Sequence, residues 1–321
     1  MDINKLVDSI IEGYKLTRSE ALELYNGRLE DLISGATRIR ENIKGNNFDL
    51  CTIINGKSGK CSEDCKYCSQ SAHYNTGAKV YPMLPLEEIV NNALKSHIDG
   101  INRFSIVTSG KRLSDKDLDY VCKCYEKIKS LCSIKLCASH GLLSYKDFKK
   151  LKKAGVTRYH NNLETSANYF KNICTTHSYE EKIESIKEAQ SAGLVVCSGG
   201  IFGLGEGFED RVDMAIQLRE LNITTVPINI LNPILGTPLE NNKILDQEDI
   251  IKSIAIYRFL LPTADLRLAG GRIILEDNGA AAIKAGINAA ITGNMLTTLG
   301  STVEDDVKMV SNLGFSVGYY E

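Results

Sequence analysis

The order of apolar and polar positions predicts three helices at the start of the chain. Apolar residues recur at helical spacing from Ile3 to Tyr14, which is typical of an amphipathic helix. Thr17 and Glu20 have the spacing of a capping box and indicate the start of a second helix. A third helix is predicted over residues 28–44. We therefore expect residues 1–45 to form a helical extension on the bottom or side of the following domain.

The rest of the chain, residues 46–321, alternates between short apolar segments and segments of helical periodicity. Strands are predicted at 48–54, 102–107, 134–138, 157–162, 194–197, 225–230, 265–269 and 287–291. Helices are predicted at 85–98, 115–130, 144–154, 178–193, 207–221, 246–261, 277–286 and 302–313. Eight strand–helix units without a dinucleotide-binding glycine fingerprint predict an α/β fold, a TIM-type (βα)8 barrel. A doubly wound open sheet is the alternative.

Composition excludes several classes of partner. The chain of 321 residues has a net charge of −2, so no general attraction to nucleic acid is expected. No apolar run approaches the length of a membrane span, and the first residues lack the pattern of a secretory signal. We therefore expect a cytoplasmic protein whose ten cysteines are reduced and available to metal.

Cys61, Cys65 and Cys68 place three thiols within eight residues. A zinc knuckle would need a fourth Cys or His, usually from a second C-x-x-C pair, and no such pair follows. Three thiolates suit a cubane iron–sulfur cluster with one open iron, because soft thiolate ligands select such clusters. The spacing, with Tyr67 before the last cysteine, resembles the radical S-adenosylmethionine (SAM) superfamily. In that superfamily the open iron chelates SAM.

Further cysteines lie on three of the predicted strands, at Cys51, Cys137 and Cys197, and Arg267 lies on another. Active sites of (βα)8 barrels form at the carboxyl ends of the strands, so these side chains are expected to converge. A single buried cysteine is usually a small apolar residue, but three at one level favour a second metal site. Four other cysteines are predicted to be structural: Cys122, Cys124, Cys132 and Cys174.

Asn162 and Glu164 follow the fourth predicted strand and have the chemistry to bind a ribose diol. The alternative is that they only cap the loop after that strand. The segment 198–206 is glycine-rich and follows the fifth strand. Its Gly199, Gly200 and Ile201 are expected to let the backbone approach a bound adenosine or methionyl group closely.

Several longer stretches resemble the biotin synthase family over nearly the whole chain. They are CSEDCKYCSQSAHYNTG, NNLETS, VCSGGIFGLGE, VPINIL with the following NP and ILGTPL, and LRLAGGR. The resemblance implies insertion of sulfur between two unactivated carbons of dethiobiotin to form biotin. It also implies a [4Fe–4S] cluster that reduces SAM, giving methionine and a 5′-deoxyadenosyl radical that removes hydrogen from the substrate. The sulfur would come from an auxiliary cluster that is consumed.

The resemblance also implies roles for individual residues. The SAM cluster would be bound by Cys61, Cys65 and Cys68, and SAM itself by Asn162 and Glu164, with Tyr67 beside the adenine. Asn229 would bind the ureido ring of dethiobiotin, and His160 stands where a substrate-contacting asparagine is common. The expected site residues are therefore catalytic (Cys61, Cys65, Cys68, Arg267), cofactor-binding (Tyr67, Asn162, Glu164, Gly199, Gly200, Ile201) and substrate-binding (Asn229, His160).

The auxiliary site departs from the family. The usual [2Fe–2S] cluster takes three cysteines and one arginine, and Cys137, Cys197 and Arg267 match, but Ser105 stands at the other cysteine position. Cys51, on the neighbouring strand, offers a thiol where a small hydroxyl residue is common. We hypothesise that Cys51, Cys137 and Cys197 bind a four-iron cluster whose open iron carries an extra sulfide, with Arg267 nearby. A [2Fe–2S] cluster with Arg267 as fourth ligand is the alternative.

Two other functions remain open from the sequence. One is a different radical SAM enzyme that does not insert sulfur, and the other is a non-catalytic iron–sulfur or zinc protein. The resemblance further implies a flavodoxin- or ferredoxin-type electron donor and a homodimer.

Overall fold

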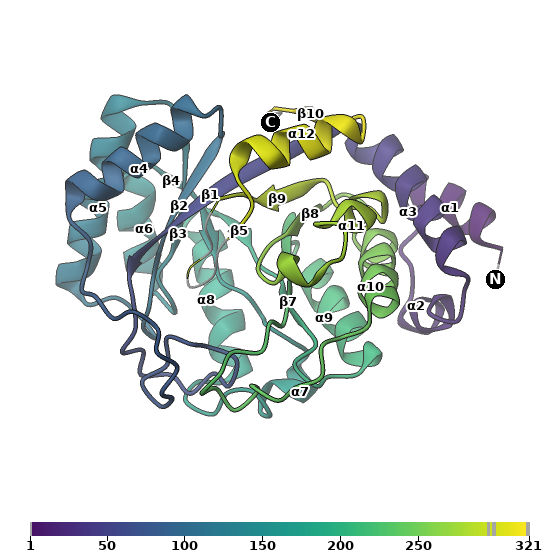
Figure 1. Cartoon of the computed structure of the whole chain (residues 1–321), viewed down its shortest axis with the longest axis horizontal. Coiled ribbons are helices and arrows are strands. Elements are labelled where there is room, and N and C mark those ends of the chain that lie inside the picture. Colours follow the sequence, from purple (N-terminus) through teal and green to yellow (C-terminus); the bar gives the residue numbers. More distant parts are fainter. Residues whose placement is uncertain (1, 294–295, 297–299, 319–321) are drawn as a thin grey trace.

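The computed structural model describes residues 2–293, 296 and 300–318, and these include a closed parallel barrel (Figure 1). The barrel strands are β1 (Asn47–Lys57), β2 (Arg103–Thr108), β3 (Lys135–Ser139), β4 (Val156–His160), β5 (Val195–Cys197), β7 (Thr225–Ile230), β8 (Asp265–Leu268) and β9 (Ala289–Ile291). Neighbouring strands pair in this order, and β9 pairs with β1 to close the barrel. The predicted (βα)8 fold is therefore confirmed, and the open-sheet alternative is wrong.

The helices surround the barrel and connect consecutive strands (Figure 1). They are α4 (Leu86–Ile98), α5 (Asp115–Leu131), α6 (Tyr145–Lys153), α8 (Tyr179–Ser191), α9 (Phe208–Glu220), α10 (Gln247–Leu260), α11 (Ala280–Lys284) and α12 (Val303–Asn312). Each corresponds to a predicted helix, and all except α5, which extends one residue further, are shorter than predicted. The largest difference is α11, which begins only after the left-handed Gly279. No helix within the described ranges is long and apolar enough to cross a membrane.

Four short elements were not predicted: β6 (Gly200–Phe202), β10 (Ser316–Val317), α7 (Ala167–Phe170) and the 3-10 helix η1 (Arg272–Ile274). Of these, β6 shapes the site, because it extends the glycine-rich segment alongside β7. A side chain at Gly199 would meet the Pro227 carbonyl oxygen at 1.9 Å, and one at Gly200 would meet the Glu164 carbonyl oxygen at 2.4 Å. The absence of side chains thus allows this close approach of backbones.

The N-terminal helices are α1 (Ile3–Ile11), α2 (Arg18–Leu24) and α3 (Leu29–Lys44) (Figure 1). Of these, α2 packs against α9 and α10, α3 packs against α10, and α1 packs on α3. The Thr17–Glu20 capping box is present at the start of α2, as expected. Division of the chain at residue 45 stays a prediction.

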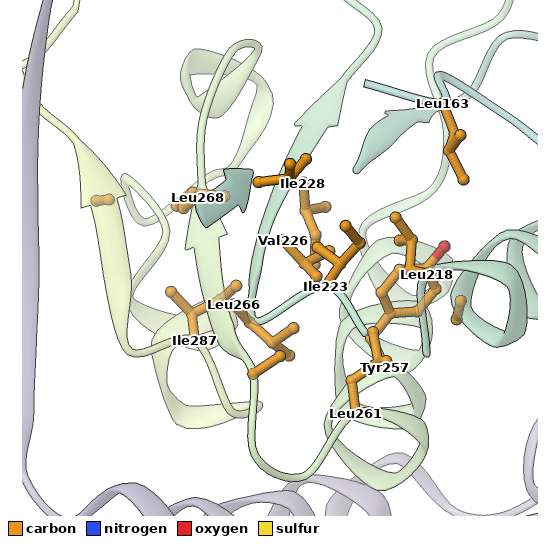
Figure 2. Packing of buried hydrophobic residues seen from close by; sticks show 14 of the residues in the cluster. Leu163, Leu218, Ile223, Val226, Ile228, Tyr257, Leu261, Leu266, Leu268 and Ile287 are labelled. Carbon is orange, nitrogen blue, oxygen red and sulfur yellow. The ribbon is translucent and has the colours of Figure 1, made fainter. Parts of the chain in front are cut away.

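Alternation along the strands separates an apolar layer from a polar barrel interior. In β8, Leu266 and Leu268 are buried in the apolar layer that packs against the helices (Figure 2). Arg267, between them, belongs to the opposite face and lines the cavity inside the barrel. The barrels of most such enzymes are filled by branched apolar side chains, whereas this one has charged residues inside.

Candidate active site

A cavity of about 450 Å³ occupies the interior of the barrel and its carboxyl-terminal mouth. Its lining includes residues from all eight barrel strands, together with Cys61 and Cys68 from the loop after β1. The sequence-predicted site residues that line it are Cys51, Cys61, Tyr67, Cys68, Cys137, His160, Asn162, Glu164, Cys197, Ile201, Asn229 and Arg267. Barrel closure therefore brings nearly all of the predicted site into one chamber.

The loop after β1 holds its three cysteines in a fixed backbone geometry. The Cys61 amide donates to the Gln70 carbonyl at 3.0 Å, and the Cys68 amide donates to the Cys65 carbonyl at 2.9 Å. Burial, opposed by backbone hydrogen bonds and reinforced by the charge of Cys61, raises the pKa of the Cys68 thiol to about 11. Without metal these thiols stay protonated near pH 7. Coordination to iron would remove the proton, so the cysteines would bind the cluster as thiolates. Three adjacent thiols in one ordered loop fit a cluster with one open iron.

Cys174 joins this loop, although it was predicted to be only structural. Its Sγ lies 3.8 Å from Cys65 Sγ and 3.3 Å from Nδ1 of His177. Nδ1 of His177 also lies 2.6 Å from Oε2 of Glu63, and both of these side chains are buried. The structural role of Cys174 stays a prediction, although its thiol contacts a predicted cluster ligand. The C-x-x-H spacing of Cys174 and His177 was the signal in the sequence that could have revealed it.

Tyr67, Asn162 and Glu164 meet at the upper part of the cavity. Nδ2 of Asn162 donates to Oε2 of Glu164 at 3.2 Å, and its Oδ1 accepts from the Gly199 amide at 3.0 Å. Burial raises the pKa of Tyr67 well above its ordinary value, and the charge of the hydrogen-bonded Glu164 adds to the effect. Glu164 has φ of +73°, a strained conformation for a residue with a side chain. Such strain is typical of functional sites.

The interior cysteines come together lower in the barrel. Cys51 and Cys137 both line this part of the cavity, and each thiol shifts the pKa of the other, upward for Cys51 and downward for Cys137. Nη1 of Arg103 lies 3.7 Å from Cys137 Sγ. Burial acts to raise the pKa of Cys137, but the Cys51 thiol and the charges of Arg103 and Arg158 lower it to about 6. Burial raises the pKa of Cys197 to about 11, and the charge of Cys137 acts in the same direction. The three thiols are thus electrostatically coupled and surrounded by guanidinium groups, which suits an anionic cluster.

Arg267 is bound to the protein on both arms of its guanidinium group. Nη2 contacts the Asp49 carboxylate, and Nη1 donates to the Asp49 carbonyl at 3.2 Å and the Ala290 carbonyl at 2.9 Å. Asp49 also lies 3.8 Å from Arg158. Arg267 therefore lines the same cavity as the cysteines, while its N–H groups donate to residues of β1 and β9.

The two predicted substrate contacts differ in their environment. Burial, followed by the charges of Lys182 and Arg267, lowers the pKa of His160 to about 4, so the imidazole is neutral near pH 7. Asn229 donates to the Gly200 carbonyl at 3.0 Å and accepts from the Gly270 amide at 2.9 Å. Its amide thus ties β7 to its neighbours and retains one N–H for a ligand.

Asn161 is a further cavity residue that was not assigned a role from the sequence. It is buried and lines the cavity, and its Nδ2 has no hydrogen-bond partner among the described residues. A buried amide donor without a partner is costly, which indicates that a ligand accepts from it. Its position in the sequence, directly before Asn162, was the available signal.

Comparison with known proteins identifies the family. Residues 55–218 match the Radical SAM superfamily, and residues 227–316 match the Biotin and Thiamin Synthesis associated domain. A protein of Clostridium botulinum (strain Langeland / NCTC 10281 / Type F) named biotin synthase is 56% identical over 316 residues, which cover 98% of this chain and 99% of that protein. A biotin synthase of Clostridium perfringens (strain 13 / Type A) is 50% identical over 315 residues, with the same coverage. The chain belongs to the biotin synthase family.

Among solved structures, methylornithine synthase (PylB) superposes with a TM-score of 0.86 at 19% identity, covering 98% of this chain and 97% of that one. This likeness supports the barrel fold alone. Membership of the biotin synthase family and of the radical SAM superfamily implies SAM and a [4Fe–4S] cluster as cofactors.

Proposed function

We propose that this enzyme inserts sulfur into dethiobiotin to form biotin, by the radical SAM reaction of the biotin synthase family. Family membership carries this proposal, and the grouping of three thiols at the mouth of the barrel supports it. When bound at Cys61, Cys65 and Cys68, the [4Fe–4S] cluster supplies the electron that cleaves SAM.

The protein residues bind the reactants and exclude water. Glu164 and Asn162 bind the ribose of SAM, and Tyr67 lies beside the adenine, since the three already form one polar group on the cavity wall. The remaining side-chain N–H of Asn229 and the unpaired Nδ2 of Asn161 donate to the ureido oxygen of dethiobiotin. His160 contacts the substrate as a neutral imidazole. An enclosed chamber is needed because a carbon radical must meet its partner atoms within about 3–3.5 Å.

The sulfur donor is an auxiliary cluster bound by Cys51, Cys137 and Cys197. Cys51 lines the same cavity as Cys137 and Cys197, and its thiol and that of Cys137 shift each other's pKa, which favours Cys51 over Ser105 as a ligand. Thiolate is also a much better ligand for an iron–sulfur cluster than the hard oxygen of a serine. The binding of Arg267 to Asp49 supports a cluster without arginine as its fourth ligand, hence a four-iron cluster whose open iron carries the extra sulfide. The [2Fe–2S] form with Arg267 as a ligand is the competing proposal.

A flavodoxin- or ferredoxin-type protein would donate the electrons, and we propose that the enzyme acts as a homodimer. Both follow from the family.

Two matched variants test the ligand assignment. Cys51→Ala and Ser105→Ala each remove one polar atom from the same wall of the cavity. We expect Cys51→Ala to lose the auxiliary iron and sulfide and to form no biotin, while it still cleaves SAM. Ser105→Ala is expected to retain its iron content and to form biotin. The measurements are anaerobic iron and sulfide counts, methionine release and biotin yield in one turnover.

Full iron content and biotin formation in Cys51→Ala would refute the ligand assignment. If the wild-type enzyme with a complete auxiliary cluster cleaved SAM without forming biotin, the sulfur-insertion reaction itself would be wrong. The chain would then be a radical SAM enzyme of another kind.

A further inference from the structure

A second, smaller cavity of about 120 Å³ lies beneath the active-site chamber, at the amino-terminal end of the barrel strands. It is lined almost entirely by polar side chains: Lys44, Asn47, Asp49, Arg158, Asp265 and Asn288, with Gly318. Lys44 and Asp265 form an ion pair of 2.8 Å, and their side chains are 25% and 24% exposed. These two residues therefore form a rim that reaches solvent.

Arg158 lines both cavities. Its guanidinium group lies 3.8 Å from Asp49, whose carboxylate also holds Arg267 in the upper chamber. Asp49 and Arg158 are thus a thin polar partition between the lower cavity and the three interior cysteines. In other barrels of this type, layers of apolar side chains fill this position.

The partition retains unused hydrogen-bonding capacity. Oδ1 of Asp49 and Nε of Arg158 are buried, and neither has a hydrogen-bond partner among the described residues. Buried polar atoms are normally paired, so this part of the barrel is built to hold water or a small polar solute.

The charged side chains around the partition favour a small anion over a cation as the solute. The side chains of Arg103, Arg158 and Arg267 oppose the single carboxylate of Asp49, while Lys44 and Asp265 neutralise each other at the rim. The field above the rim therefore attracts a small anion and repels a divalent cation.

We propose that the lower cavity is the access route for hydrosulfide, HS⁻, to the auxiliary site. This inference rests on the proposed function, in which each turnover removes one sulfide from the auxiliary cluster. Hydrosulfide is a small monovalent anion that binds an open iron as a ligand, with no change of oxidation state in that step. The two electrons that formation of the two C–S bonds leaves on the cluster are removed separately, by the oxidised form of the electron-donor protein. Dethiobiotin and SAM occupy the upper chamber, so a route from below allows sulfide to return without their departure.

Asn47 offers a matched pair of variants, because its side chain lines the lower cavity and lies outside the active-site chamber. Asn47→Phe fills the cavity with a bulky ring, whereas Asn47→Ala widens it. After one turnover and removal of products, the anaerobic enzyme is supplied with ferrous iron and sodium sulfide. The recovery of auxiliary-cluster absorbance and of acid-labile sulfide per chain is then followed with time.

We expect Asn47→Phe to regain its auxiliary sulfide at least tenfold more slowly than wild type, and Asn47→Ala to match wild type within twofold. Biotin yield in the first turnover should be unchanged in both, since the cluster is already in place. Equal recovery in the phenylalanine variant would overturn the route. Absence of first-turnover biotin in wild type would instead overturn the proposed function.

A second measurement uses the wild-type enzyme alone and does not depend on the folding of a variant. Recovery is followed with saturating SAM and dethiobiotin but no reductant, so that the upper chamber is occupied and no radical forms. Access from below predicts recovery within twofold of the rate without these ligands. Recovery that stops when they are bound would show that sulfide enters from above.

Discussion

Replacement of Cys174 by alanine should lower the reduction potential of the SAM cluster. In the structure the Cys65 thiol donates to the Cys174 sulfur at 3.8 Å. In the proposed site Cys65 binds iron as a thiolate and loses its proton, so the hydrogen bond between the two sulfurs is then donated by Cys174. Reduction adds negative charge to the cluster, and a donor to one of its sulfurs stabilises the reduced state more than the oxidised one. Hydrogen bonds to cluster sulfurs are among the factors that set such potentials.

The size of the shift follows from the strength of this hydrogen bond. A typical hydrogen bond contributes about 1 kcal/mol net, and the thiol is a weak donor. For a one-electron couple, about 1.4 kcal/mol corresponds to about 59 mV. The expected change in Cys174→Ala is therefore about 20–40 mV toward more negative potential, with slower reductive cleavage of SAM.

The assay is a redox titration followed by electron paramagnetic resonance, with iron content measured on each sample. Cys174→Ser retains a donor and should lie closer to wild type, and Cys122→Ala, which alters a half-buried thiol on α5, should not change the potential. A potential within about 10 mV of wild type in Cys174→Ala, at full iron content, would refute the hydrogen-bond argument.

Three further outcomes are expected. Arg258 is fully buried, and its guanidinium group makes six hydrogen-bond contacts of 2.7–3.3 Å, one N–H being shared between two acceptors. Arg258→Met should therefore destabilise the fold by about 3–5 kcal/mol in anaerobic thermal melts, whereas Arg38→Met, at a partly exposed side chain, should cost under about 1 kcal/mol. Similar melting of the two variants would contradict this. Burial lowers the pKa of His140 to about 3, so its contribution to stability is complete above the unfolded value of about 6.5 and is lost as the pH falls. At pH 5 the loss of stability should reach about 2 kcal/mol, and His140→Gln should flatten the dependence of the melting temperature on pH. If this variant shows the same pH dependence as wild type, the role of His140 is wrong. Asp49→Asn should weaken the contact that holds Arg267 and shift the spectrum of the auxiliary cluster, while an unaltered spectrum would show that Asp49 does not position Arg267.

Much of the fold and part of the site could be predicted from the sequence, because the signals involved are local. Strand and helix periodicity extends over a few residues, and it predicted all eight barrel strands. The ligands proposed for the SAM cluster lie within eight residues, so their spacing alone brings the thiols together. The barrel rule placed Cys137 and Cys197 at one chamber without coordinates.

Other features were decided only by the tertiary structure. Cys174 lies 109 residues from Cys65, and Asp49 lies 218 residues from Arg267, yet each pair is in contact. No pattern along the chain encodes such contacts, because they depend on the path of a loop after β4 and on closure of the barrel between β9 and β1. Periodicity indicates which face of a strand is buried, but the distance between side chains on opposite walls depends on strand order, register and tilt. For this reason the polar partition between the two cavities, and the placement of Cys51 and Cys137 on the wall of one cavity, became visible only in the folded chain.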